Sequence, residues 1–240
     1  MAEKNLIDTP IAPAATTEKR DFWVMYSKTI IYAGTAAILI LAGWFGYQHF
    51  IKLPKEKNAN EAVFPAENLF DKMAAIGFNK DSVNIVLNGG NLEGTSVTGL
   101  LKVINNYGGT EAGNRAKYMT GASYLHINEF DKAIKYLKDF DAHGALQVES
   151  KAYGMIGHAY AEQKKIDDAL SFYKKAAEVN DKDESITPDA LMLAASYAEA
   201  TGKNKEAIDL FKKLRDNYPT SATVANGEVD KNLAKLGVTD

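Results

Sequence analysis

The sequence predicts an all-α protein in which a single transmembrane helix precedes a helix-turn-helix solenoid. Two observations lead to this fold class. Residues 29–51 contain no Asp, Glu, Lys or Arg, and about twenty apolar residues suffice for a helix to cross the hydrocarbon core of a bilayer. Residues 113–219 repeat a pattern of small and aromatic side chains with a period typical of stacked helical hairpins.

The apolar stretch at residues 29–51 has the flanks of a membrane-spanning helix. Trp23 and Tyr26 precede it and Trp44 and Tyr47 lie near its end, where aromatic rings favour the headgroup level. The membrane anchor is represented by Ile30, Leu39, Leu41 and Trp44. Two alternatives are a buried core helix and a cleaved signal peptide, whose apolar region has about 7–15 residues and a small-residue cleavage site. The longer apolar run favours an uncleaved signal anchor.

Charge next to the span does not decide its orientation. Residues 19–28 hold three basic side chains and residues 52–57 hold three, so the count that normally places the more positive side in the cytoplasm is a tie. Long domains translocate largely regardless of charge. We expect residues 1–28 to be a disordered cytoplasmic tail, because they are rich in Pro, Ala and Thr and have little to bury.

Composition excludes several functions. The formal net charge of −3 falls on residues 52–240 and gives no broad attraction to nucleic acid. The chain has no cysteine, which excludes disulfides and thiolate metal sites. His126 and His158 lack the further ligands that a metal site needs. We expect no cofactor, no metal and no catalytic residue.

Residues 52–112 predict a polar stalk followed by divergent helical hairpins. Apolar residues at three- and four-residue spacing predict a helix over 60–76, with Pro65 near its start. A short helix is expected over 81–87, and a Gly-rich loop separates it from a helix over 95–107.

Three repeats follow in residues 113–219. Gly121 to Tyr124 aligns with Gly157 to Tyr160 and with Ala194 to Tyr197. Ala133, Ala169 and Ala207 then correspond, if one residue is inserted at the turn 201–204 of the third copy. Small residues such as Gly157 allow the two helices of a hairpin to approach closely. A single helix over 221–236, within a capping segment 220–240, is expected to end the array.

These repeats resemble the tetratricopeptide repeat (TPR), and the second copy fits best. The resemblance implies a concave groove lined by the first helix of each hairpin. Carried onto this chain, the groove comprises Arg115, Tyr118, Ala122, Leu125 and His126, then Lys151, Gly154, His158, Ala161 and Glu162, and finally Leu191, Ala195, Ala198 and Glu199. Small and apolar side chains of this kind suit a bound polypeptide segment.

The order of segments resembles the ancillary Sec-translocon subunit family of bacterial single-span TPR proteins. The segments that carry the likeness are residues 60–70, 100–107, 110–118 and 133–137. It implies a non-catalytic adaptor or chaperone-like subunit in the bacterial inner membrane, with a cytoplasmic N-terminus and a periplasmic TPR domain. Its partners would be Sec translocon subunits, a membrane-anchored periplasmic folding factor, nascent exported polypeptides and the lipid bilayer. The alternatives are a scaffold for a different envelope complex and an enzyme with a site in the groove.

Overall fold

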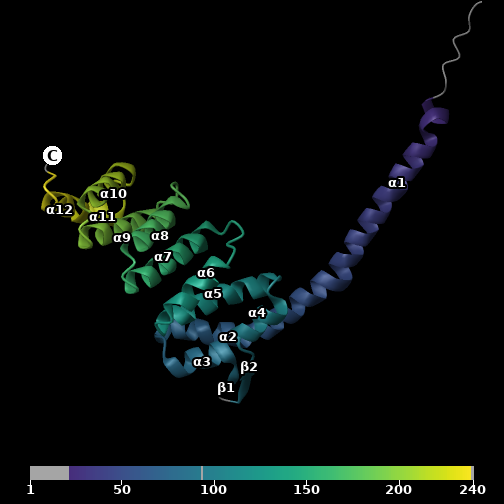
Figure 1. Ribbon diagram of the computed structural model, residues 1–240, viewed down its shortest axis with the longest axis horizontal. Coiled ribbons are helices and arrows are strands. Elements are labelled where there is room, and N and C mark those ends of the chain that lie inside the picture. Colours follow the sequence, from purple (N-terminus) through teal and green to yellow (C-terminus); the bar gives the residue numbers. More distant parts are fainter. Residues whose placement is uncertain (1–21, 93, 239–240) are drawn as a thin grey trace, which may run out of the picture. The chain divides into compact units, whose positions relative to one another are not determined.

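The computed structural model describes residues 22–92 and 94–238. Two compact units make up the chain, Met1–Lys52 and Leu53–Asp240, and Figure 1 follows their elements along the sequence. The described residues are mostly helical, which confirms the all-α class. One two-stranded hairpin is the β-structure among them.

The first unit contains the predicted membrane anchor. Helix α1 runs over Phe22–Tyr47 and a π-helical turn follows over Gln48–Lys52. The large apolar side chains of α1 are exposed, with Leu39 at 67% and Trp44 at 60%. Among the described residues, one helical stretch, Met25–Ile76, is long and apolar enough to cross a membrane by length and composition.

The helix begins earlier than predicted. Residues 22–28, which we assigned to a disordered tail, are helical in α1. The rest of the predicted tail lies outside the described residues. Helix α1 therefore extends seven residues before the predicted anchor, and the bounds 29–51 of the membrane-spanning part stay a prediction.

The second unit begins with a helix where the sequence suggested a polar stalk. Helix α2 runs over Leu53–Ile76. It buries Ala59, Val63, Ala66, Leu69 and Met73 on one face, and this spacing of three and four residues stabilises the helix from Ala59 onward. Pro65 lies inside α2, so its interpretation as a helix start was wrong.

A β-hairpin replaces part of a predicted helix. Helix α3 (Lys80–Asn88) is followed by β1 (Gly90–Leu92), β2 (Thr95–Val97) and α4 (Leu100–Tyr107). The strands are antiparallel, with Gly90 opposite Val97. The prediction of a helix over 95–107 was thus wrong for its first five residues. Val97 is buried, but it belongs to strand β2 and not to the apolar face of a helix.

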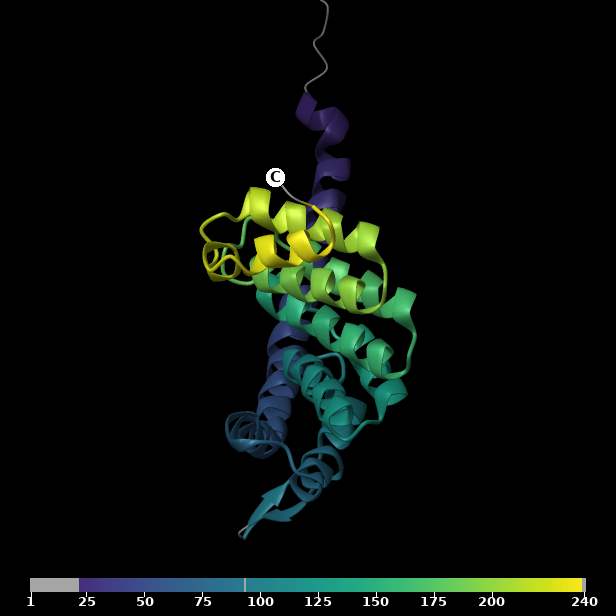
Figure 2. The same cartoon turned by 90° about the vertical axis from the view of Figure 1, so that its left-hand side faces the viewer.

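Three helix pairs form the TPR-type solenoid that the sequence predicted. They are α5 (Glu111–His126) with α6 (Phe130–Lys138), α7 (Leu146–Glu162) with α8 (Ile166–Glu178), and α9 (Thr187–Ala200) with α10 (Asn204–Asn217). Each helix packs on the next one along the chain. Figure 2 shows the pairs as successive layers.

The turns within the three pairs have the same length. The residue in the left-handed region is Asn128 (φ 64°), Lys164 (φ 62°) and Gly202 (φ 76°) in turn. The residue after each donates its N–H to a carbonyl five positions back, which belongs to Tyr124, Tyr160 and Ala198. Ala198, not Tyr197, is therefore equivalent to the two tyrosines.

This equivalence corrects the predicted alignment of the third repeat. We placed one inserted residue at the turn 201–204, but the extra length lies earlier. Leu137, Tyr173 and Phe211 occupy matching places on the second helices, and Gly121, Gly157 and Ala195 oppose them with spacings of 36 and 38 residues. The two extra residues of the third repeat consequently lie between Tyr173 of α8 and Ala195 of α9.

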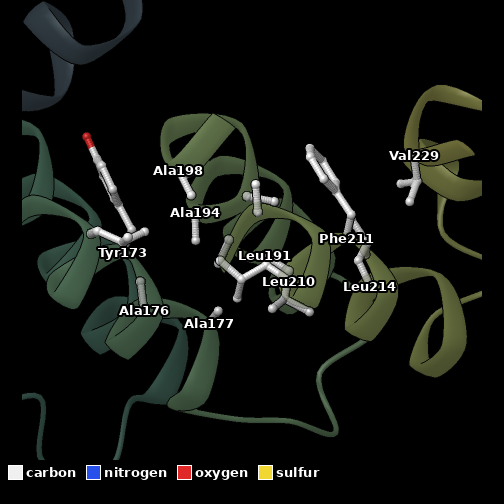
Figure 3. Close-up of a cluster of buried hydrophobic side chains, with 14 of the residues drawn as sticks. Tyr173, Ala176, Ala177, Leu191, Ala194, Ala198, Leu210, Phe211, Leu214 and Val229 are labelled. Carbon is white, nitrogen blue, oxygen red and sulfur yellow. The ribbon is translucent and has the colours of Figure 1, made fainter. Parts of the chain in front are cut away.

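Close approach within each pair depends on the small residue of the first helix. A Cβ atom on Gly121 would lie 2.5 Å from Leu137, and one on Gly157 would lie 2.6 Å from the Tyr173 ring. Figure 3 shows the core beyond this contact, where Leu191, Phe211 and Leu214 pack together.

The chain ends in two short helices where one was predicted. Helix α11 spans Ala222–Ala225 and α12 spans Glu228–Lys235. Gly227 adopts φ 77° between them and breaks the helix. Val229 of α12 is fully buried and joins the core of α9 and α10.

Candidate functional site

Two hollows lie on either side of Tyr118. The first, of about 340 Å³, lies between α2, α5 and the connection from α6 to α7. The second, of about 420 Å³, lies between α5, α7 and α9. The half-buried Tyr118 lines both. Its ring centroid is 5.3 Å from that of Phe140, and burial raises the pKa of its phenol.

The second hollow contains most of the predicted groove residues of α7. Lys151, Gly154 and His158 line it from α7, and Asp189 and Leu193 face them from α9. Lys151 and Asp189 place opposite charges on its rim. Met155 also lines the hollow and was not predicted. The predicted Ala161 is half-buried and Glu162 is exposed on the same helix, outside this hollow.

The predicted groove residues of the third repeat are mostly in the core. Leu191, Ala195 and Ala198 are fully buried and do not line a groove. The reason is the one-residue error in the alignment of this repeat. The equivalent positions, counted 38 residues on from α7, belong to Asp189, Met192, Ser196 and Glu199, which are exposed or half-buried.

Two further predictions on α5 also need correction. Ala122 is 4% exposed, so it does not line an open groove. His126 stacks on Phe78, with ring centroids 3.6 Å apart, and partial removal of water lowers its pKa. Leu125 is half-buried and packs against the core. The segment between α2 and α3 thus contacts the end of α5 that we expected to be open.

Arg115 lines the first hollow but is also engaged with α2. Its Nε atom is 3.2 Å from the carboxylate of Glu67, and its Nη2 donates to Asn60 over 3.0 Å. Glu67 and Phe70 of α2 line the same hollow. The polar contact therefore holds α5 against α2 while leaving the mainly apolar floor between them accessible.

A second contact from α2 caps the N-terminus of α5. The carboxylate of Glu56 accepts hydrogen bonds from the backbone N–H groups of Glu111 (3.0 Å) and Ala112 (3.1 Å). A helix N-terminus has such donors free and favours a negative charge. No local pattern in the sequence predicts this pairing.

His158 is held at the edge of the second hollow by Tyr173. Its Nδ1 atom is 2.9 Å from the Tyr173 hydroxyl, which in Figure 3 points away from the apolar cluster. Partial burial lowers the pKa of the imidazole, and the nearby charge of Glu162 opposes this effect. Burial also raises the pKa of the Tyr173 phenol. His126 and His158 each have their own aromatic partner, and no group of metal ligands occurs among the described residues.

The geometry suits side chains of a bound polypeptide. Each hollow has a floor that is mainly apolar and a rim with charged groups, as in sites that take one or a few side chains. Phe140 and Val148 help form the first hollow. Phe140 matches Ala176 in the repeat pattern but was not assigned to a groove, and Val148 lies at a helix start that the pattern did not single out.

The three helix pairs have the fold of a TPR-type solenoid, an architecture that implies protein–protein interaction in general. The comparison with protein families agrees: residues 151–222 match the tetratricopeptide repeat family. The match covers α7 to α10, which are the second and third repeats. No curated protein matches the chain.

Proposed function

We propose that the protein is a non-catalytic adaptor, tethered to the bacterial inner membrane by α1, that associates with the Sec translocation channel and a membrane-anchored periplasmic folding factor. The main support is the pair of hollows flanking Tyr118 on the first helices of a TPR-type array. The likeness of residues 60–70 and 100–118 to the ancillary Sec-translocon subunits supports the choice of partners.

In this proposal the N-terminus is cytoplasmic and residues 53–240 are periplasmic. The uncovered apolar surface of α1 faces lipid and the channel. A segment of the folding factor or of a nascent exported polypeptide occupies the two hollows. Tethering keeps the groove at a high effective concentration near the channel, so weak contacts to each segment suffice.

Site-specific photo-crosslinking in intact cells tests this proposal. A photoreactive phenylalanine analogue replaces Gly46 in α1, or Tyr118 or Leu193 in the hollows. Lys212 is exposed on α10 and provides the control position. Captured proteins are identified by mass spectrometry.

We expect Sec-channel subunits from Gly46, and the folding factor or exported polypeptides from Tyr118 and Leu193 but not from Lys212. Capture of only another envelope complex would contradict the Sec association and favour a scaffold for that complex. Tyr118→Ser should reduce capture at Leu193, whereas Tyr136→Ser, at a half-buried tyrosine outside both hollows, should not.

A further inference from the structure

A row of alternating lysines and aromatic rings crosses α6, α7 and α8 outside the two hollows. It consists of Lys165, Tyr160, Lys138, Phe172 and Lys175, and we call it the lysine–aromatic row. The Nζ atoms of Lys165 and Lys138 lie 5.6 Å and 5.2 Å from the centre of the Tyr160 ring. Those of Lys138 and Lys175 lie 5.1 Å and 4.6 Å from the centre of Phe172. The two rings are 5.5 Å apart.

Within the described part of the chain, the three ammonium groups have aromatic rings as neighbours and no acid as an ion-pair partner. Among the described residues, no carboxylate lies within ion-pair distance of Lys138, Lys165 or Lys175. Lys138 donates one hydrogen bond to the Tyr160 hydroxyl over 2.8 Å, which leaves further N–H donors free. A face of an aromatic ring orients a cation without neutralising it.

The row borders a third hollow, of about 700 Å³. Lys138, Phe172 and Lys175 line it together with Tyr153. It also contains three acids. Asp139 pairs with Lys117 over 2.9 Å, and Asp141 lies 3.3 Å from a ring nitrogen of His143. Lys138 and Lys175 are the lysines that line this hollow without an ion-pair partner among the described residues, and Asp141 and Glu149 add negative charge beside them.

We propose that the lysine–aromatic row is a second interaction surface, which binds an acidic segment of a partner polypeptide. Carboxylates of the segment pair with Lys138 and Lys175, and an adjacent apolar side chain rests against Tyr153 and Phe172 in the hollow. Lys165 extends the surface beyond Tyr160. The five residues of the row line neither hollow beside Tyr118, although the third hollow adjoins the first through Phe140 and the three residues after it. The proposal does not depend on an association with the Sec channel.

The surroundings favour a polypeptide over an anionic lipid surface. The three acids that line the hollow would lie close to lipid phosphates and repel them. A polypeptide avoids this repulsion because its carboxylates are spaced along the chain and its apolar side chains match the aromatic wall. Tyr160, Lys165, Phe172 and Lys175 also lie within the segment that matches the TPR family.

The test measures peptide binding to the full chain in phosphatidylcholine nanodiscs by fluorescence anisotropy. The probe is a labelled twelve-residue peptide of alternating Glu and Leu, and its control has Gln at every Glu position. We expect the Glu peptide to bind more tightly than the Gln peptide, with an affinity that falls as salt rises. The double variant Lys138→Gln/Lys175→Gln should weaken binding about tenfold, as expected for the loss of two partly exposed ion pairs.

Matched variants separate the row from general charge. Lys102→Gln/Lys212→Gln removes the same charge at two exposed lysines elsewhere and should leave the affinity within about twofold, since distant exposed charges are screened. Lys138→Arg/Lys175→Arg should retain binding. Circular dichroism confirms that every variant is folded. Equal loss in both Gln double variants would overturn the proposal, and so would capture of the protein by phosphatidylglycerol vesicles, in a row-dependent manner, without peptide binding.

Discussion

The ring of Tyr173 lies so close to Gly157 that a Cβ atom on Gly157 would be 2.6 Å from two ring carbons. A Cβ atom on Gly154, one turn earlier on α7, would have no atom within 4 Å. These two glycines of one helix therefore have different roles. Gly157 allows α7 and α8 to approach, whereas Gly154 opens the second hollow.

Gly157→Ala should destabilise the second unit by about 1–3 kcal/mol, the usual range for overpacking a core. The buried Tyr173 is 2% exposed and has little room to move. Gly154→Ala is the matched control. It should be neutral or stabilise the helix by up to about 1 kcal/mol, because alanine favours helix. Chemical denaturation followed by circular dichroism gives both values. Equal destabilisation by both variants would contradict the assigned contact.

The free energy of unfolding should fall as the pH drops below the pKa of an ordinary histidine. Folding lowers the pKa of His158 from 6.5, mainly through desolvation. The unfolded chain therefore binds more protons than the folded chain in this range, and the free energy of unfolding decreases as the pH falls. Comparison of denaturation at pH 7.5 and pH 5.5 should show a smaller decrease for His158→Gln than for the original chain. Identical decreases in the two proteins would show that protonation of His158 does not contribute to the loss of stability.

The corrected alignment of the third repeat predicts opposite effects for adjacent residues. Leu191 is fully buried, so Leu191→Ala should cost about 2–5 kcal/mol of stability. Met192 is half-buried at a position equivalent to Gly154. Met192→Ala should cost less stability and instead reduce photo-crosslinking from Leu193. Denaturation and crosslinking of both variants distinguish the two alignments, since the uncorrected one places Leu191 in the groove and predicts little loss of stability for Leu191→Ala.

Loss of the Glu56 carboxylate should weaken the start of α5. Glu56→Ala removes the acceptor of two backbone N–H groups, which typically costs about 1 kcal/mol at a helix N-terminus. Glu61→Ala, at an exposed acid on the same helix, is the control and should change stability by less than about 0.5 kcal/mol. Hydrogen exchange of the amides of Glu111 and Ala112 should accelerate only in the Glu56 variant. Unchanged exchange would refute the cap.

The sequence alone was sufficient to predict the three helix pairs, but it did not predict every helix boundary. Apolar spacing and the small residues at Gly121 and Gly157 predicted the repeats, because these patterns act within one helix pair. The strand at Thr95–Val97 was missed because Val97 fits an apolar helix face as well as a buried strand position. The features that argue against a helix in this segment are Gly89 and Gly94, which both have positive φ.

The alignment error had a different origin. Tyr197 matches Tyr160 by residue type, but Gly202 matches Lys164 by backbone conformation, and the backbone determines which side of α9 is buried. A comparison of turn lengths would have favoured the correct positions. Contacts such as Phe78 with His126 and Glu67 with Arg115 join residues far apart in sequence, and no periodic pattern predicts them.

The Glu56 contact also has a consequence for the order of synthesis. Its partner Glu111 is 55 residues further along the chain. At about 5–20 residues per second, this interval takes roughly 3–11 s. Helix α2 therefore emerges from the ribosome ahead of α5, which covers part of its apolar stripe and receives its carboxylate. The pace of translation across residues 57–111 thus sets how long the first helix of the second unit remains open to proteases and to wrong partners.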